Sequence, residues 1–174
     1  MVYYQYGDIL VRDMQRSDAD DFVREECAQG WHATPDKFFT RLEHKKEGRA
    51  IPLVAEYAGH PAGYLSLYDR PGAGPYAEKN WPEVVDFAVL EKYRGKGVGS
   101  RLMDVAEMIA AQTSDTICIG VGLHNGYGPA QRLYVRRGYV PDGSGVWYHD
   151  RVLEQYAPCV NDDELILHLA KKLR

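Results

Sequence analysis

One segment constrains the fold more than any other, because residues 83–112 join a strand, a glycine turn and an amphipathic helix. The run EVVDFAVL (83–90) is largely apolar and leads into EKYRGKGVG. The helix expected over SRLMDVAEMIAAQ (100–112) has one continuous apolar face. The side chains of that face are Val98, Leu102, Val105 and Ile109. A strand that enters a helix in this way predicts an α/β fold with helices covering a mixed central sheet.

The rest of the chain supplies the other elements of that fold. Further strands are expected over 8–13, 51–57, 62–68, 116–123, 139–149 and 163–173. Further helices are expected over about 18–28, from Thr34-Pro35 to Gly48, and over 130–137. Ser17 is expected to cap the first of these helices, with Asp20 completing a capping box. The predicted order is β-α-α-β-β-β-α-β-α-β-β.

The length and composition of the chain limit the classes of protein to which it can belong. A chain of 174 residues predicts a single domain over 1–174. The formal net charge of −4 argues against a nucleic-acid partner, which would need a basic surface. No apolar run is long enough to span a membrane and no signal peptide is recognisable, so we expect a cytoplasmic protein. The three cysteines are far apart, so we expect neither a disulfide nor a metal site.

The glycine turn is typical of an anion site. At the start of a helix several backbone N–H groups have no partner, and the helix dipole adds partial positive charge. Arg94 and Lys96 add formal positive charge there. A phosphate or pyrophosphate is the expected ligand. The GxxxxGK[ST] pattern is absent, and Ser100 and Leu102 stand where a GxGxxG fingerprint needs glycine.

The pattern R-x-x-G-x-G, formed by Arg94, Gly97 and Gly99, resembles the GNAT superfamily of acyl-CoA-dependent N-acetyltransferases. The resemblance extends over residues 83–140, where Asn125 and the run AQRLYVRRGY also match. The GYGP that follows Asn125 departs from the family pattern. The resemblance implies acetyl-CoA as co-substrate, and a gap between strands 83–90 and 116–123 that holds its acyl arm. The residues it assigns to acetyl-CoA are Phe87, Ala88, Val89, Arg94, Gly95, Lys96, Gly97, Val98, Gly99, Ser100 and Asn125.

Acetyl transfer to an amine needs a base, a donor for the carbonyl oxygen and an acid for the leaving thiolate. The resemblance implies the backbone N–H of Val89 as donor and Tyr134 as acid. Glu83 resembles a glutamate that some members use as base. Strand alternation predicts that Glu83, Val85, Phe87 and Val89 share one face and Asp86 the other. Asp86 or a water molecule is the alternative base.

We therefore expect an N-acetyltransferase that acts on a primary amine of a small molecule. The alternatives are a protein N-terminal or lysine acetyltransferase and a non-catalytic acyl-CoA-binding module. Monomer and homodimer both stay open. By resemblance the acceptor site is walled by the first two helices and the last strands. The residues concerned are Glu25, Glu26, Trp31, His32, Phe38, Phe39 and the 143–148 hairpin.

Overall fold

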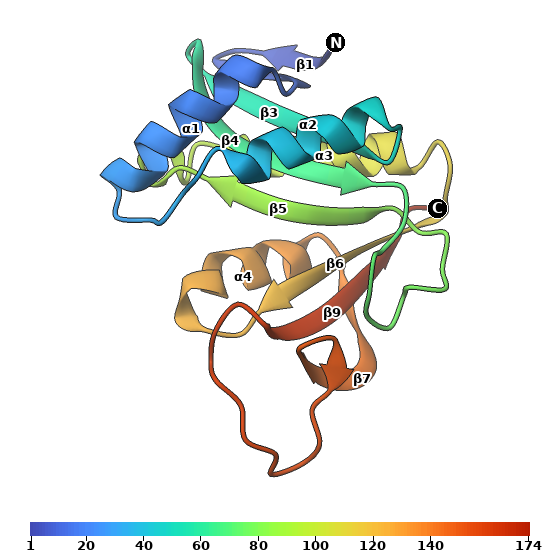
Figure 1. Cartoon of the computed structure of the whole chain (residues 1–174). Helices are drawn as coiled ribbons and strands as arrows, with labels where there is room; N and C mark the ends of the chain where they lie inside the picture. The colour runs from blue at the N-terminus through green and yellow to red at the C-terminus, as the bar shows by residue number, and fades with distance from the viewer. The chain divides into compact units, whose positions relative to one another are not determined.

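The amphipathic helix that follows the glycine turn, α3 (Val98–Ala110), buries the face predicted for it. Val98, Leu102 and Val105 are buried and Ile109 is half-buried. The computed structural model describes all residues, 1–174. They form two units, the first made of residues 1–68 and 85–109 and the second of residues 69–84 and 110–174 (Figure 1).

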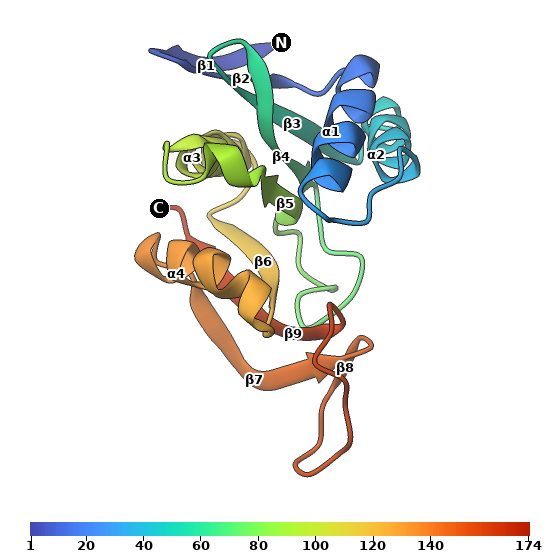
Figure 2. The ribbon, with the colours of Figure 1, turned by 90° about the vertical axis from the view of Figure 1, so that its left-hand side faces the viewer.

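The first unit consists of an antiparallel sheet with helices on both faces. Its elements are β1 (Val2–Tyr6), β2 (Ile9–Asp13), α1 (Arg16–Ala28), α2 (Asp36–Lys46), β3 (Ala50–Tyr57), β4 (His60–Tyr68), most of β5 (Glu83–Val89), and α3. Strands β1 to β4 pair in sequence order, and the turn after residue 57 makes the predicted hairpin. In Figure 2, α1 and α2 lie on one side of β3 and β4, and α3 lies on the other.

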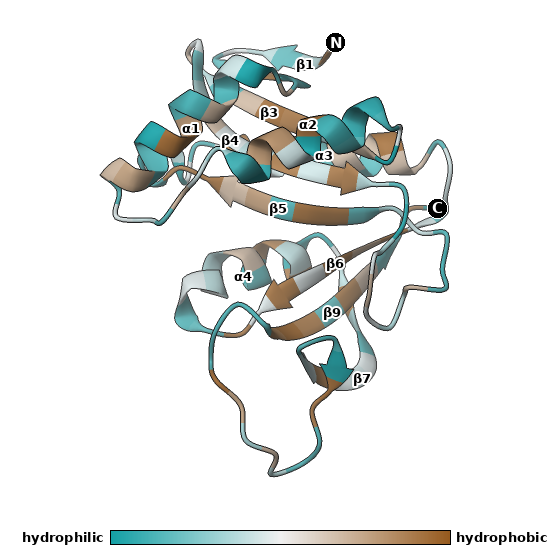
Figure 3. Ribbon diagram, in the orientation of Figure 1, coloured by the Kyte–Doolittle hydropathy of each residue, from teal (hydrophilic) through white to brown (hydrophobic).

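Aromatic side chains form the core between α1, α2 and the sheet. The rings of Phe22 and Phe38 meet the ring of Tyr64 edge-on, with centroids 4.8 and 5.1 Å away. All three side chains are buried. Burying one such side chain is worth about 1.5–3 kcal/mol, so this contact anchors both helices. Figure 3 agrees with this layout, since β3 is mainly hydrophobic while much of α1 and α2 is hydrophilic.

The second unit is built on β6 (Thr116–Gly122), a β-branched strand buried as predicted. Its other elements are α4 (Gly128–Arg136), β7 (Val140–Tyr148), β8 (Arg151–Val152) and β9 (Leu165–Lys172). Strand β6 pairs antiparallel with β9, and β9 pairs antiparallel with β7. In Figure 2, α4 lies on one side of β6 and β9, and loop 69–82 lies on the other.

Strand β5 links the two units. Its first two residues, Glu83 and Val84, pair in parallel with Cys118 and Ile119 of β6. Its remaining residues belong to the first unit. The predicted α/β class with a mixed sheet is confirmed. The predicted gap between the two strands would involve both units and stays a prediction.

The start of α1 differs from the prediction. Gln15, not Ser17, is the N-cap. Asp18, not Asp20, is the acidic partner, and its carboxylate accepts a hydrogen bond from the Gln15 backbone N–H at 2.6 Å. Arg12 holds both oxygens of the same carboxylate at 2.7 and 2.8 Å. This ion pair joins the end of β2 to the first turn of α1 and accompanies the observed cap.

Strands β1 and β8 were not predicted from the sequence. Strand β1 is a mostly exposed edge strand, and β8 has only two residues. Neither has the buried face that produces an apolar pattern. No helix of the protein is both long enough and apolar enough to cross a membrane.

Candidate functional site

The predicted anion loop lies at the start of α3 in the first unit. Gly95 and Gly97 have φ angles of 74° and 86°, which L side chains rarely adopt. The first helical bond runs from the Arg101 N–H to the Gly97 carbonyl at 3.1 Å. The N–H groups of residues 98–100 therefore precede the helical ladder and can face a ligand.

Two cations flank this loop, and each contacts an aromatic ring. The Arg94 guanidinium lies 5.6 Å from the centre of the Trp31 ring. The Lys96 ammonium lies 4.7 Å from the centre of the Tyr57 ring. Both cationic residues are exposed, so each ring orients a charge that solvent and ligands can reach.

Gly99 has a packing role. A Cβ added there would lie 3.1 Å from the Phe87 ring and 3.3 Å from Val89. The glycine therefore lets α3 pack closely against β5. All three glycines thus have a conformational or packing reason of their own. The glycine pattern alone does not distinguish a ligand loop from a tight turn, so the ligand assignment depends on the N–H groups that precede the helical ladder and on the two cations.

The backbone of β5 leaves strand geometry at Asp86, whose φ is 56°. Phe87 and Val89 do share a face, because both contact Gly99. Regular alternation does not continue through Asp86, so alternation does not place Glu83 on that same face. The Asp86 carboxylate pairs with the Arg41 Nε at 2.5 Å.

Glu83 lies in the second unit, where β5 begins beside β6. Burial raises the pKa of its carboxyl to about 7, and the charge of Asp150 adds to the rise. The backbone N–H of Gly72 donates a hydrogen bond to the carboxylate and partly opposes the shift. A carboxylate with a pKa near 7 can gain and lose a proton at neutral pH.

Tyr134 is buried on α4, with 3% of its surface exposed. Burial raises the pKa of its hydroxyl. The group is therefore protonated at neutral pH, as a proton donor must be. Its ring packs on that of Tyr139, with centroids 5.9 Å apart.

Asn125 begins a 3₁₀ turn that leads into α4, and its side chain is exposed. The GYGP departure forms this turn and the start of α4, with Pro129 in the first helical turn. The neighbouring His124 accepts a hydrogen bond from the Gly126 N–H and lies 3.1 Å from Asp163. His124 therefore has a structural role at this corner.

Several residues expected to wall the acceptor site have structural roles. Glu26 is 1% exposed and pairs with Lys37 at 3.0 Å, while the Tyr64 hydroxyl donates to it. Glu25 pairs with Lys92 at 2.5 Å. Phe38 lies in the core. These contacts account for the presence of the three side chains without any role in binding a ligand.

The predicted residues therefore divide between the units. The first unit contains residues 87–100, where the loop, its cations and the close β5–α3 contact come together. The second unit contains Glu83, Asn125 and Tyr134. It also contains His168, a buried polar residue to which sequence reasoning gave no role. Its signal was a histidine within the apolar run LILHLA.

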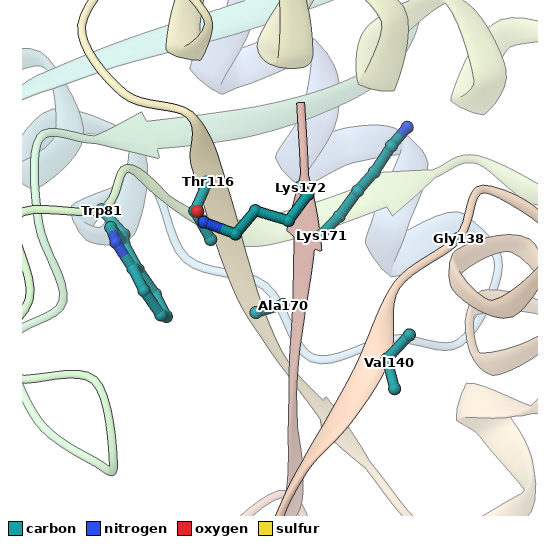
Figure 4. A pocket seen from close by; sticks show the side chains of 7 residues that line it. All are labelled: Trp81, Thr116, Gly138, Val140, Ala170, Lys171 and Lys172. Atoms are coloured by element: carbon teal, nitrogen blue, oxygen red, sulfur yellow. The ribbon is translucent and has the colours of Figure 1, made fainter. Parts of the chain in front are cut away.

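A hollow of about 400 Å³ also lies in the second unit (Figure 4). Its lining residues are Trp81, Thr116, Gly138, Val140, Ala170, Lys171 and Lys172. In Figure 4, Lys172 extends toward Thr116 and Lys171 points away from it. None of the predicted site residues lines this hollow.

Sequence comparison gives two partial relatives. The chain is 35% identical over 114 residues to a mycothiol acetyltransferase of Nocardia farcinica, covering 63% of this chain. The chain spans only 35% of the length of that relative. It is 28% identical over 107 residues to an uncharacterized N-acetyltransferase of Archaeoglobus fulgidus, covering 55% of this chain and 69% of that protein.

Structural comparison gives matches along nearly the whole chain. The Salmonella typhimurium acetyl transferase that modifies the N-terminal serine of a 50S ribosomal subunit protein has a TM-score of 0.70 at 13% identity, covering 99% of both chains. Ard1 from Thermoplasma volcanium has a TM-score of 0.68 at 18% identity, covering 95% of this chain and 98% of that one. These matches show a shared fold. The acetyltransferase (GNAT) family matches residues 11–139, and the protein is therefore a member of this acetyltransferase family.

Proposed function

We propose that the protein transfers the acetyl group of acetyl-CoA to a primary amine of a small molecule. The observation that carries the proposal is the half-buried carboxyl of Glu83, whose pKa is raised by burial to about 7. It begins the same strand, β5, that leads into the glycine loop. An anion loop and a base tuned to neutral pH on one strand fit acyl transfer to an amine.

The glycine loop fits the pyrophosphate of acetyl-CoA. The N–H groups of residues 98–100, the positive end of α3 and the charges of Arg94 and Lys96 all favour a polyanion. We assign the remaining contacts to Phe87, Ala88, Val89, Gly95, Gly97 and Asn125. Acetyl-CoA, when bound, supplies the activated acetyl thioester.

Glu83 is the proposed base. An amine attacks a thioester only in its neutral form, so the carboxylate accepts a proton from the ammonium, directly or through water. Asp86 is less suited to this role, because Arg41 holds its carboxylate in an ion pair.

Two further groups complete the proposed chemistry. The backbone N–H of Val89 is assigned as the donor to the carbonyl oxygen, which gains negative charge as the amine attacks. Tyr134 is assigned as the acid that protonates the leaving thiolate. Its buried hydroxyl keeps its proton at neutral pH, which supports that assignment.

A panel of primary amines incubated with acetyl-CoA tests the proposal, with release of free thiol as the measurement. Small amines are expected to be acetylated in the wild type and much more slowly in Glu83→Gln. The alternative of a protein acetyltransferase is favoured by the Salmonella structural match. Peptides with a free N-terminal serine therefore belong in the panel. Turnover of peptides alone would overturn the small-molecule assignment, and acetyl-CoA binding without any turnover would support a non-catalytic module.

A further inference from the structure

Among residues other than glycine, Asp86 is the only one that has a left-handed backbone inside a strand. The other non-glycine residues with a positive φ all lie in turns. The φ of 56° at Asp86 differs by roughly half a turn from the value of about −120° to −140° in a regular strand. A residue with a side chain keeps such a conformation only where its surroundings hold it. We therefore looked for the contact that holds this turn in β5.

The side chain of Arg41, on α2, supplies that contact. Its Nε donates a hydrogen bond to Asp86 Oδ2 at 2.5 Å. The two side chains are 23% and 30% exposed, so solvent screens the pair only in part. A charged hydrogen bond of this kind is stronger than a bond between neutral groups. Both residues belong to the first unit, so the contact is made within it.

Arg41 is itself oriented by Tyr68, the last residue of β4. Its Nη1 donates to the Tyr68 hydroxyl at 2.5 Å, and its guanidinium carbon lies 5.3 Å from the centre of the Tyr68 ring. The hydroxyl keeps its own proton for His44, whose Nδ1 lies 2.6 Å away. Arg41 and His44 are three positions apart on α2 and therefore lie on the same side of the helix. Contacts from α2 and β4 thus direct the guanidinium toward β5.

The segment 87–90, which follows the turn, is packed closely between β4 and α3. The Ala88 carbonyl oxygen lies 2.8 Å from the place where a Cβ on Gly63 of β4 would stand. On the other side, side chains of this segment contact Gly99 of α3. These contacts leave the segment little room to adjust. The direction in which its N–H groups point therefore depends on the backbone conformation at Asp86.

We propose that Arg41 is a positioning residue for acetyl transfer, because its bond to Asp86 holds the left-handed turn that aims the Val89 N–H at the thioester carbonyl. Arg41 acts through the backbone of β5 and touches neither substrate. Without this bond, Asp86 returns to an extended φ and the donor loses its alignment with the oxygen on which charge develops. The inference rests on the proposed function, in which the Val89 N–H is the assigned donor.

Removing the ion pair should slow the chemical step more than it weakens acetyl-CoA binding. In Arg41→Met we expect kcat to fall by about 10–100-fold, which is less than the loss of a whole oxyanion donor would cost. KM for acetyl-CoA should change much less, because the glycine loop before α3 is intact. Arg12→Met is the matched control, since Arg12 pairs with Asp18 at 2.7 Å in the same unit. It should lower Tm and leave kcat near that of the wild type.

Replacing Asp86 provides a rescue that a purely structural role of Arg41 would not predict. Asp86→Gly adopts a left-handed φ without strain, so its kcat should stay within about threefold of the wild type. Adding Arg41→Met to Asp86→Gly should then cost little more. Asp86→Asn should also be active, because asparagine tolerates this conformation and its side-chain oxygen still accepts from Arg41. Asp86→Val should lose at least as much as Arg41→Met, because a β-branched side chain disfavours a positive φ.

The conformation of the turn can also be measured without turnover. The NMR coupling constant between the amide and α protons of residue 86 depends on φ, and it is larger for an extended residue than for one at 56°. In Arg41→Met this coupling constant should rise toward the value of an extended strand. In Arg12→Met and Asp86→Asn it should stay close to that of the wild type.

The outcomes separate this inference from the proposed function. A wild-type kcat in Arg41→Met, or a low kcat that Asp86→Gly does not restore, would overturn the inference and leave the proposed function standing. Inactivity of both Asp86→Gly and Asp86→Asn would also overturn it, because Asp86 itself would then be the reacting group. If Arg41→Met does not fold, equal kcat in Asp86→Val and Asp86→Asn would overturn it. If the wild type acetylates no amine, the proposed function fails, and an unchanged coupling constant in Arg41→Met would refute the role of Arg41.

Discussion

For a single residue, the most specific prediction concerns the effect of Glu83 on kcat and on its pH dependence. With the base removed, Glu83→Gln should lower kcat by about 10²–10⁴-fold. In the wild type, log kcat should bend near pH 7 and fall about tenfold per pH unit below it, because the protonated carboxyl cannot accept a proton. The variant should lack this bend. A bend that persists unchanged would assign the titration to another group.

A stability measurement separates catalysis from damage to the fold. The folded pKa of Glu83, about 7, lies above its ordinary value of 4.5, so the folded state binds the proton more tightly. Between these values stability falls as pH rises, because the unfolded state binds fewer protons. The Tm of Glu83→Gln relative to the wild type should therefore rise from pH 5 to pH 8. A Tm difference that stays constant with pH would contradict the raised pKa of the Glu83 carboxyl.

Tyr134 is the second residue for which kinetics can separate a catalytic role from a structural one. Tyr134→Phe keeps the buried ring and removes the hydroxyl. If the hydroxyl protonates the thiolate, kcat should fall by up to about 10²–10⁴-fold, with KM for acetyl-CoA changed much less. A thiolate is a good leaving group, so the lower end is expected. Wild-type kcat together with a lowered Tm would make the hydroxyl purely structural, provided that chemistry limits turnover in the wild type.

Among the elements, the turn into α3 allows a matched comparison. Gly97→Ala and Gly48→Ala place a side chain at φ angles of 86° and 75°, and neither Cβ would clash with the protein. Both should lose similar stability, about 1–2 kcal/mol, from the left-handed backbone. Gly97→Ala alone should also weaken CoA binding in calorimetry, because its Cβ obstructs the anion. Equal CoA affinity in the two variants would refute the loop as a phosphate site.

Elements with a buried, periodic face could be predicted from the sequence. The hairpin over 51–68, the strand at 116–122 and α3 all lie close to their predicted positions. Features fixed by distant contacts could not. Asp86 has a left-handed conformation and pairs with Arg41, which lies 45 residues earlier in the chain. Local patterns contain no information on such partners.

The site shows the same division. The glycine turn and its cations were predictable, because an anion site at a helix start is a local arrangement. The ring contacts around His168 were not, because they join loop 69–82, β7 and β9, which are far apart in the chain. Only the folded structure brings the Tyr76 and Trp147 rings against this histidine.

For the whole molecule, the central question is whether the two units unfold together. Both β5 and α3 contain residues of both units, since β5 crosses at residue 84 and α3 at residue 109. Melting one unit would therefore break elements of the other. We expect a single cooperative transition, as the prediction of one domain over 1–174 requires.

The positions of the tryptophans allow the single unfolding transition to be tested by fluorescence. Trp31 is in the first unit, and Trp81 and Trp147 are in the second. In Trp31→Phe, fluorescence reports only the second unit while far-ultraviolet circular dichroism reports both. The two denaturation curves should coincide in midpoint and slope, and CoA at about 100 times its Kd should shift both by about 2.7 kcal/mol. Fluorescence that changes at a different denaturant concentration, or that does not respond to CoA bound at the first unit, would mean that the chain folds as two independent domains.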